Sequence, residues 1–124
     1  MTEANANWSR VEAQRIVAAW LNEGRRIDAI AVANDEMALG AVTALRTAGL
    51  AGKVLVGGVD GVEEAVDAVK AGEMICTILQ NGAAQGTQAV ANAATLGRGN
   101  YAQQYDWVPY ELILAENAGA YGQR

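Results

Sequence analysis

The sequence predicts an α/β fold built as an open parallel sheet with flanking helices. Short apolar runs alternate along the 124 residues with stretches of helical periodicity. The three inner runs are almost unbroken, which is typical of parallel strands that helices cover on both faces. Each connection between these runs is long enough for a right-handed crossover. The fold class follows from these three observations together.

The composition is that of a folded chain without metal chemistry. Hydrophobic residues make up 52% of the sequence and there is one Pro, so disorder is not expected. The absence of His argues against zinc sites and Ser-His-acid catalysis, and the single Cys76 cannot form an internal disulfide. A net charge of −5 argues against a nucleic-acid partner. We expect no cofactor, no metal site and no catalytic residue.

No targeting or membrane segment is predicted. The first ten residues, MTEANANWSR, lack the apolar segment of an export signal. No apolar run approaches the roughly 20 residues that a membrane span requires. The sequence also contains no low-complexity linker, so we treat residues 1–124 as a single unit.

The first half of the chain is predicted to form a helix, a strand and a second helix. A capping box of Ser9 and Glu12 begins the helix of residues 9–24, and Gly24 ends it. The apolar run 27–33 is the first strand. A helix follows over residues 35–47 and ends before Gly49.

The second half repeats this alternation. The segments 53–60 and 74–80 are predicted strands, and 61–73 and 82–97 are predicted helices. The last segment, WVPYELILAEN, has strand character, but Pro109 confines it to an edge position or a bend.

Polar side chains follow each of the three inner strands. Asn34 and Asp35 follow the first strand, Asp60 ends the second, and Gln80 and Asn81 end the third. Because the carboxyl ends of parallel strands meet at one edge of a sheet, where ligands bind, we expect a polar rim there.

Each rim residue also has a purely structural interpretation. Asp35 is favoured as a helix cap, and Asn81 could cap the next helix. For Asn34 a free amide and a local role are equally open, and Asp60 could also be a cap. Gln80 seldom caps helices, so a functional role is favoured there.

The chemistry of the rim indicates a polyhydroxylated ligand. Two amides and one carboxylate offer both donors and acceptors, and a phosphate would instead require Lys, Arg or a glycine-rich loop. Trp8 either stacks on a sugar face or packs as a hydrophobic staple on the first helix. Arg10 lies near Trp8 in the sequence, but a surface role is favoured for it. Asp60 has no base nearby that would make it a nucleophile.

Three blocks of the sequence carry a resemblance to a known family. NDEMALGAVTALRTAG, VLVGGVDGVEEAVDAVKAGE and CTILQN, in this order and spacing, resemble the C-terminal lobe of periplasmic sugar-binding proteins of the ribose-binding type. These proteins serve ABC importers and have a flavodoxin-like lobe. Effector domains of LacI-type transcription regulators are similar, so such an effector core is the alternative function.

The resemblance implies roles for four residues. Asn34, Asp60 and Gln80 match family positions that bind sugar hydroxyls, and Trp8 matches an aromatic that stacks on the sugar ring. It further implies a sugar or polyol ligand (a pentose, inositol or a similar compound), a membrane importer as the partner of the full-length protein, and a periplasmic location. An enzyme or phosphorelay domain is disfavoured, because the chain lacks His and an acidic pair with a distal Lys.

The chain departs from the family in its extent. Family members have two lobes, whereas residues 1–124 match a partial C-terminal lobe without the N-terminal one. The first strand and helix of the C-terminal lobe, with an Arg that contacts the ligand, are also missing. We therefore expect half a binding site with reduced affinity. We also expect the unpaired strand edge at residues 27–33 to pair with a second copy.

Overall fold

The computed structural model of the chain describes residues 1–121 and divides into two compact units. The first consists of Met1–Leu79 and the residues from Leu112 onward, and the second is Gln80–Glu111. The sequence predicted a single unit without an internal boundary. The two units do not establish whether all 124 residues belong to one lobe, so this assignment stays a prediction.

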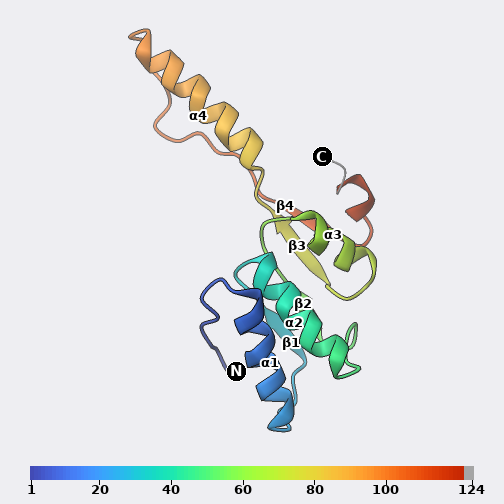
Figure 1. The fold of residues 1–124 in the computed structure, drawn as a ribbon. Coiled ribbons are helices and arrows are strands. Elements are labelled where there is room, and N and C mark those ends of the chain that lie inside the picture. Colours follow the sequence, from blue (N-terminus) through green and yellow to red (C-terminus); the bar gives the residue numbers. More distant parts are fainter. Residues whose placement is uncertain (122–124) are drawn as a thin grey trace. The chain divides into compact units, whose positions relative to one another are not determined.

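The elements follow the predicted alternation (Figure 1). In chain order they are α1 (Arg10–Asn22), β1 (Ala29–Ala31), α2 (Asp35–Thr47), β2 (Leu55–Gly57), α3 (Glu63–Lys70), β3 (Cys76–Leu79), α4 (Gly82–Gly97), β4 (Glu111–Leu114) and the short 3-10 helix η1 (Ala118–Ala120). The four helices confirm the predicted ones, whereas the strands are shorter than their apolar runs.

The strands form one sheet in the order β1-β2-β3-β4. β1 pairs in parallel with β2, with Ile30 opposite Val56, and β2 pairs in parallel with β3, with Gly57 opposite Cys76. The α/β class with a parallel sheet is thereby confirmed. β1 and β4 lie at the two edges, as expected for the segment that contains Pro109.

Local signals in the sequence set the helix ends. The Ser9 side chain accepts a hydrogen bond from the backbone N–H of Glu12, and the Asn81 side chain accepts one from that of Ala84. Gly49 and Gly72, which follow α2 and α3, have φ values of +69° and +74°. The predicted caps and stops are therefore confirmed at these positions.

The core of the first unit lies between one face of the sheet and α1, α2 and α3. Its fully buried side chains include Leu45, Val56, Val66, Val69 and Ile113. Alternate strand residues point the other way and stay exposed: Ala29, Ala31, Leu55 and Leu112. Helical cover on both faces, which the apolar runs predicted, is thus not found within residues 1–121.

Candidate functional site

The starts of three helices meet at the edge of the sheet where β1, β2 and β3 end. Arg10, the first residue of α1, donates two hydrogen bonds to Glu36 at the start of α2, both of 2.9 Å. It donates two more, of 2.7 and 2.8 Å, to Glu64 at the start of α3. These bonds lower the pKa of Glu64. Arg10 therefore ties three helices together, and the surface role that the sequence favoured for it stays a prediction.

Asp35 is the fully buried carboxylate of this edge. Its Oδ2 accepts hydrogen bonds from the backbone N–H of Gly61 at 2.8 Å and of Val62 at 3.0 Å. The hydroxyl of Thr77 on β3 donates to Oδ1 at 2.7 Å. Asp35 therefore holds the start of α2 to the loop after β2 and to β3.

The prediction that Asp35 caps the helix is wrong. Asn34 is the N-cap, because its Oδ1 accepts from the backbone N–H of Met37 at 3.0 Å. Asp35 is the first helical residue, and its side chain turns into the protein. Burial raises the pKa of Asp35 and the hydrogen bonds to its carboxylate oppose this rise. Capping occupies only the oxygen of the Asn34 amide and does not use its two N–H donors.

Asp60 follows β2 in an unusual backbone conformation. Its φ is 128°, a value that side-chain-bearing residues seldom adopt. Its N–H donates to the carbonyl of Ile78 at 2.8 Å, and it forms a parallel bridge with Leu79. The cap position of α3 is Val62, not Asp60. Asp60 is therefore not the N-cap residue of α3, and it lies half-buried at the sheet edge.

Trp8 precedes the Ser9 cap in a strained turn. Asn7 and Trp8 have φ values of 49° and 59°, and the Ser9 N–H donates to the carbonyl of Ala6 at 2.9 Å. A left-handed conformation is a marked outlier for a residue as bulky as Trp. The side chain is 69% exposed, so it does not pack as the staple that the sequence left open.

Gln80 belongs to the second unit. Its Oε1 accepts a hydrogen bond from the hydroxyl of Tyr110 at 3.2 Å. Along the chain it follows Leu79, the bridge partner of Asp60. The structure thus brings Asn34 and Asp60 to one edge through the contacts of Asp35, whereas the place of Gln80 beside them stays a prediction.

Sequence reasoning missed two residues of this region, Thr77 and Tyr110. Thr77 lies inside an apolar strand, where a lone hydroxyl is a weak signal. The sequence offered one indirect clue, the Gly57-Gly58 pair. A side chain at Gly58 would collide with the Asp35 carboxylate, so the pair indicates a crowded polar contact at this end of β2, but it does not identify Thr77. Tyr110 had no signal beyond its place next to Pro109, because its partner lies 30 residues away in the sequence.

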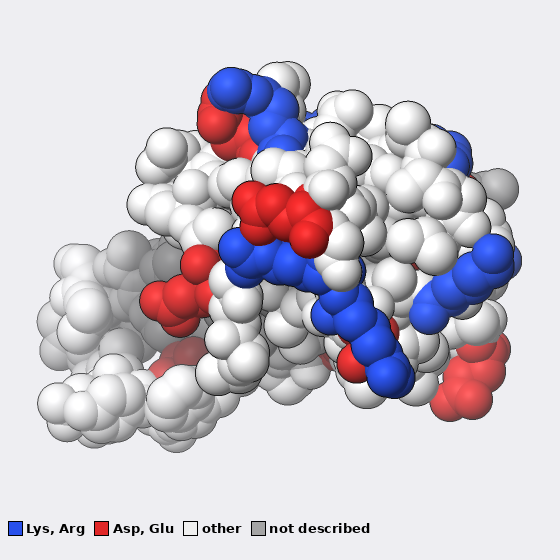
Figure 2. Space-filling model, turned by 90° about the horizontal axis from the view of Figure 1, so that it is seen from below, with Lys and Arg blue, Asp and Glu red and all other residues white. Residues whose placement is uncertain are grey.

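Metal-ligating groups, the Cys76 thiol, surface charge and helix hydrophobicity were also compared across the described residues. Within residues 1–121, no group of three or more His, Cys, Asp or Glu side chains could hold a metal ion. Burial raises the pKa of the Cys76 thiol, which keeps it protonated. Figure 2 shows small groups of adjacent acidic and basic side chains on one face, and uncharged surface lies between these groups. Across the same residues, no helix has the length and apolar character that a membrane span needs.

Comparison with known proteins gives consistent matches. A xylitol-binding protein of Mycolicibacterium smegmatis is 40% identical over 80% of this chain and 28% of its own length. An ABC transporter solute-binding protein of Bacillus halodurans, solved with bound myo-inositol, is 38% identical with a TM-score of 0.86, over 94% of this chain and 40% of that one. A periplasmic solute-binding protein of Actinobacillus succinogenes, solved with bound D-allose, is 36% identical with a TM-score of 0.90, over 95% of this chain and 42% of that one.

The chain therefore spans well under half the length of the relatives that it matches. The family profile described as "Periplasmic binding protein domain" matches residues 2–100, which is most of the sequence. With the sheet order and the polar edge described above, these matches show that the chain belongs to the periplasmic binding protein domain family.

Proposed function

We propose that this chain is the sugar- or polyol-binding part of a solute-binding protein that serves an ABC importer in the periplasm, and that it performs no catalysis. Relatives named for xylitol, myo-inositol and D-allose support this role. None of these three is a transcription regulator, so import is favoured over the effector core of a LacI-type regulator.

The observation that carries the proposal is the backbone strain at Trp8 and Asp60. Both residues hold positive φ values that cost free energy, about 1–3 kcal/mol each. Arg10 joins the helix that follows Trp8 to the helix that follows Asp60, so both strained residues lie at the same end of the first unit. The fold maintains this backbone strain at an aromatic residue, Trp8, and at a polar residue, Asp60. Strain of this kind is concentrated at functional sites, so it supports a binding role for this edge.

In the proposed mechanism each side chain has a separate part. The exposed Trp8 indole stacks on the apolar face of the ligand, and the Asp60 carboxylate accepts hydrogen bonds from adjacent hydroxyls. The N–H groups of Asn34 and Gln80 donate to ligand oxygens. Each charge-assisted bond to Asp60 contributes about 1.5–3 kcal/mol. The chain spans well under half the length of its relatives, so further contacts would come from parts of the fold outside residues 1–124, and we expect weak binding by these residues alone.

A thermal-shift titration with xylitol, myo-inositol and D-allose tests this proposal. At ten times the dissociation constant, a bound ligand raises the free energy of unfolding by about 1.4 kcal/mol. We expect a saturable rise of the unfolding temperature with at least one of these compounds. Trp8→Ala and Asp60→Ala should each abolish it.

Tyr101→Ala is the matched control, because this aromatic is 84% exposed and lies outside the proposed site. It should leave the ligand-induced shift unchanged. A shift that survives both Trp8→Ala and Asp60→Ala, or no shift with any of the three compounds at high millimolar concentration, would contradict the proposal.

The same proposal includes pairing of two copies through β1. This strand lies at the edge of the sheet, and its residues Ala29 and Ala31 are exposed. Val32 N–H and the carbonyl of Asp28 bond to β2, so the N–H groups of the alternate residues point to the open side. Such an edge favours pairing with another strand.

Sedimentation equilibrium over micromolar concentrations tests the pairing. We expect a monomer–dimer equilibrium that Ala31→Pro removes, because Pro has no N–H to donate. Ala31→Ser retains this donor and should dimerise like the unchanged chain. A monomer at every concentration would refute the pairing and leave the ligand proposal untouched.

A further inference from the structure

The loop of residues 58–62, which follows β2, holds Asp60 in a strained backbone conformation. A φ of 128° persists in a residue with a side chain only where the surrounding structure over-determines it. Two rigid peptide groups flank the Cα of Asp60, one on each side. Their relative orientation sets φ and ψ, and with them the direction of the Cα–Cβ bond. The bonds that these two groups make therefore decide where the Asp60 side chain points.

Strand β3 holds the peptide group before Asp60. The Asp60 N–H donates to the carbonyl of Ile78 at 2.8 Å, and the Gly58 N–H donates to that of Cys76 at 3.1 Å. Both bonds continue the parallel pairing of β2 with β3. They fix the path of the chain up to Asp60, but by themselves they do not restrict rotation about its N–Cα bond.

Asp35 holds the peptide group after Asp60. The Gly61 N–H donates to Asp35 Oδ2 at 2.8 Å and to Thr77 Oγ1 at 3.2 Å, and the Val62 N–H donates to the same Oδ2 at 3.0 Å. The Thr77 hydroxyl in turn donates to Asp35 Oδ1 at 2.7 Å. Asp35 and Thr77 are both fully buried, and hydrogen bonds to a charged acceptor are stronger than neutral ones. A fixed carboxylate thus completes the restraint on Asp60.

The two glycines beside Asp60 bring the loop into direct contact with these partners. A side chain at Gly58 would collide with Asp35 Oδ1, and one at Gly61 would meet Leu79 at 2.8 Å. Only a residue without a side chain fits at either position. The segment that contains Asp60 therefore lies directly against the residues that hold it.

We propose, on the basis of the proposed function, that Asp35 is a positioning residue of the ligand site. Supported by Thr77, it holds the Asp60 backbone in its strained conformation and so directs the Asp60 carboxylate toward ligand hydroxyls. Asp35 acts only through Asp60 and does not contact the ligand. A carboxylate suits this task, because one of its oxygens accepts from two successive backbone N–H groups at once.

The three-bond NMR coupling between the N–H and Hα protons of Asp60 tests this positioning without a ligand. This coupling depends on φ: it is small near 128° and larger in the extended and helical regions. Asp35→Ala should raise it. Thr77→Val should raise it less, because Asp35 still accepts from Gly61 N–H. Thr77→Ser retains the hydroxyl and should restore the coupling of the unchanged chain.

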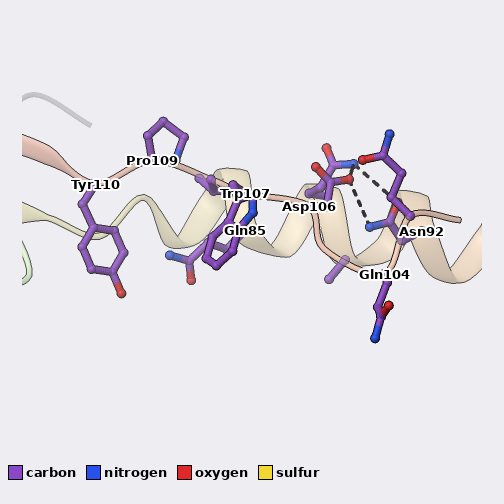
Figure 3. Close-up of a pocket in the computed structure, with 11 residues that line it drawn as sticks. Gln85, Asn92, Gln104, Asp106, Trp107, Pro109 and Tyr110 are labelled. Carbon is purple, nitrogen blue, oxygen red and sulfur yellow. Dashed lines mark hydrogen bonds between the residues drawn. The ribbon is translucent and has the colours of Figure 1, made fainter.

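Two control variants separate positioning from general effects. Leu45→Ala removes a fully buried side chain near the other end of α2, so it destabilises the first unit without removing a contact of the loop. Asp106→Ala removes a carboxylate of the second unit, which accepts hydrogen bonds from Gln88 and Asn92 (Figure 3). Both variants should leave the Asp60 coupling unchanged.

NMR titrations with xylitol, myo-inositol and D-allose measure the consequence for binding. The signals of the folded state report the affinity even where a variant is less stable. Asp35→Ala should bind at least about tenfold more weakly than the unchanged chain, which corresponds to the loss of one charge-assisted hydrogen bond at Asp60. Leu45→Ala and Thr77→Ser should bind like the unchanged chain.

The outcomes distinguish this inference from the proposed function. An Asp60 coupling that stays the same in Asp35→Ala and Thr77→Val, or that rises equally in Leu45→Ala, would overturn the positioning role. Unchanged affinity in Asp35→Ala would do the same. If Asp35→Ala does not fold, Thr77→Val and Thr77→Ser decide. If none of the three compounds binds the unchanged chain, the proposed function fails, whereas the coupling still decides whether Asp35 positions Asp60.

Discussion

Replacement of Asp35 tests the central contact of the sheet edge. This buried carboxylate accepts hydrogen bonds from the backbone N–H of Gly61 and Val62 and from the Thr77 hydroxyl. Asp35→Ala removes all three acceptor contacts. Gly61 N–H keeps a partner, since it also donates to Thr77 Oγ1 at 3.2 Å. Two donors, the Val62 N–H and the Thr77 hydroxyl, then lose their acceptor.

The expected loss of stability follows from these two donors. Each buried donor without a partner costs about 1–3 kcal/mol, so their sum is about 2–6 kcal/mol. Removal of a buried charge returns part of this cost, because the charged form of Asp35 is penalised by burial. We expect Asp35→Ala to lower the free energy of unfolding by about 3 kcal/mol. Asp35→Asn keeps one acceptor oxygen and should lose about half as much.

Urea unfolding measures these differences, and the pH supplies a second readout. The pKa of an unfolded Asp is about 3.9, and burial raises the folded value of Asp35 above it. Between these two values the folded state keeps a proton that the unfolded state has lost. The contribution of Asp35 to the free energy of unfolding therefore falls as the pH rises through this window. In Asp35→Asn this fall should be absent.

Asp28→Ala is the matched control. Asp28 pairs with Arg26 on the surface, with its side chain 76% exposed, so its removal should change the free energy of unfolding by less than about 0.5 kcal/mol. The explanation of the Asp35 contacts is refuted if Asp35→Ala is as mild as Asp28→Ala. It is also refuted if Asp35→Asn has the same dependence on pH as the unchanged chain.

Three further substitutions test neighbouring contacts. Arg10→Met should lower the free energy of unfolding by at most about 1 kcal/mol, and the difference should shrink in high salt, because its ion pairs are partly exposed. Gly61→Ala should destabilise more than Gly49→Ala in urea unfolding: both positions have positive φ, but only at Gly61 would a new Cβ meet Leu79, at 2.8 Å. Tyr110→Phe should leave the urea midpoint within error but shift the side-chain amide NMR signals of Gln80, whose Oε1 loses its donor.

Much of the fold could be predicted because its signals are local. The capping residue Ser9, the glycines that end α2 and α3, and the apolar periods of the helices are each legible within a few residues. Strand ends were less predictable, since β1 spans Ala29–Ala31 while its apolar run is longer. Pairing with a neighbour, not hydrophobicity, decides where a strand ends.

The candidate site was predicted in part. The main error, the prediction that Asp35 and not Asn34 caps α2, has a physical cause. Asn34 and Asp35 are both good capping residues, and sequence alone does not decide which one faces the helix start. The choice depends on donors 26 and 27 residues further along, the N–H groups of Gly61 and Val62. These donors need a strong acceptor inside the protein, which Asp35 supplies, and the cap is left to Asn34.

For helix α4 the sequence predicts the element but not which of its sides contacts the rest of the chain. Its existence and its cap at Asn81 follow from local sequence, yet its hydrophobic pattern would predict that Val90 and Leu96 face inward. They are exposed, and the contact that α4 makes with the returning segment is polar, because Asp106 accepts hydrogen bonds from Gln88 and Asn92. Hydrogen bonds between residues 14 and 18 positions apart, which the apolar pattern of the helix does not reveal, therefore identify the side of α4 that the returning segment contacts.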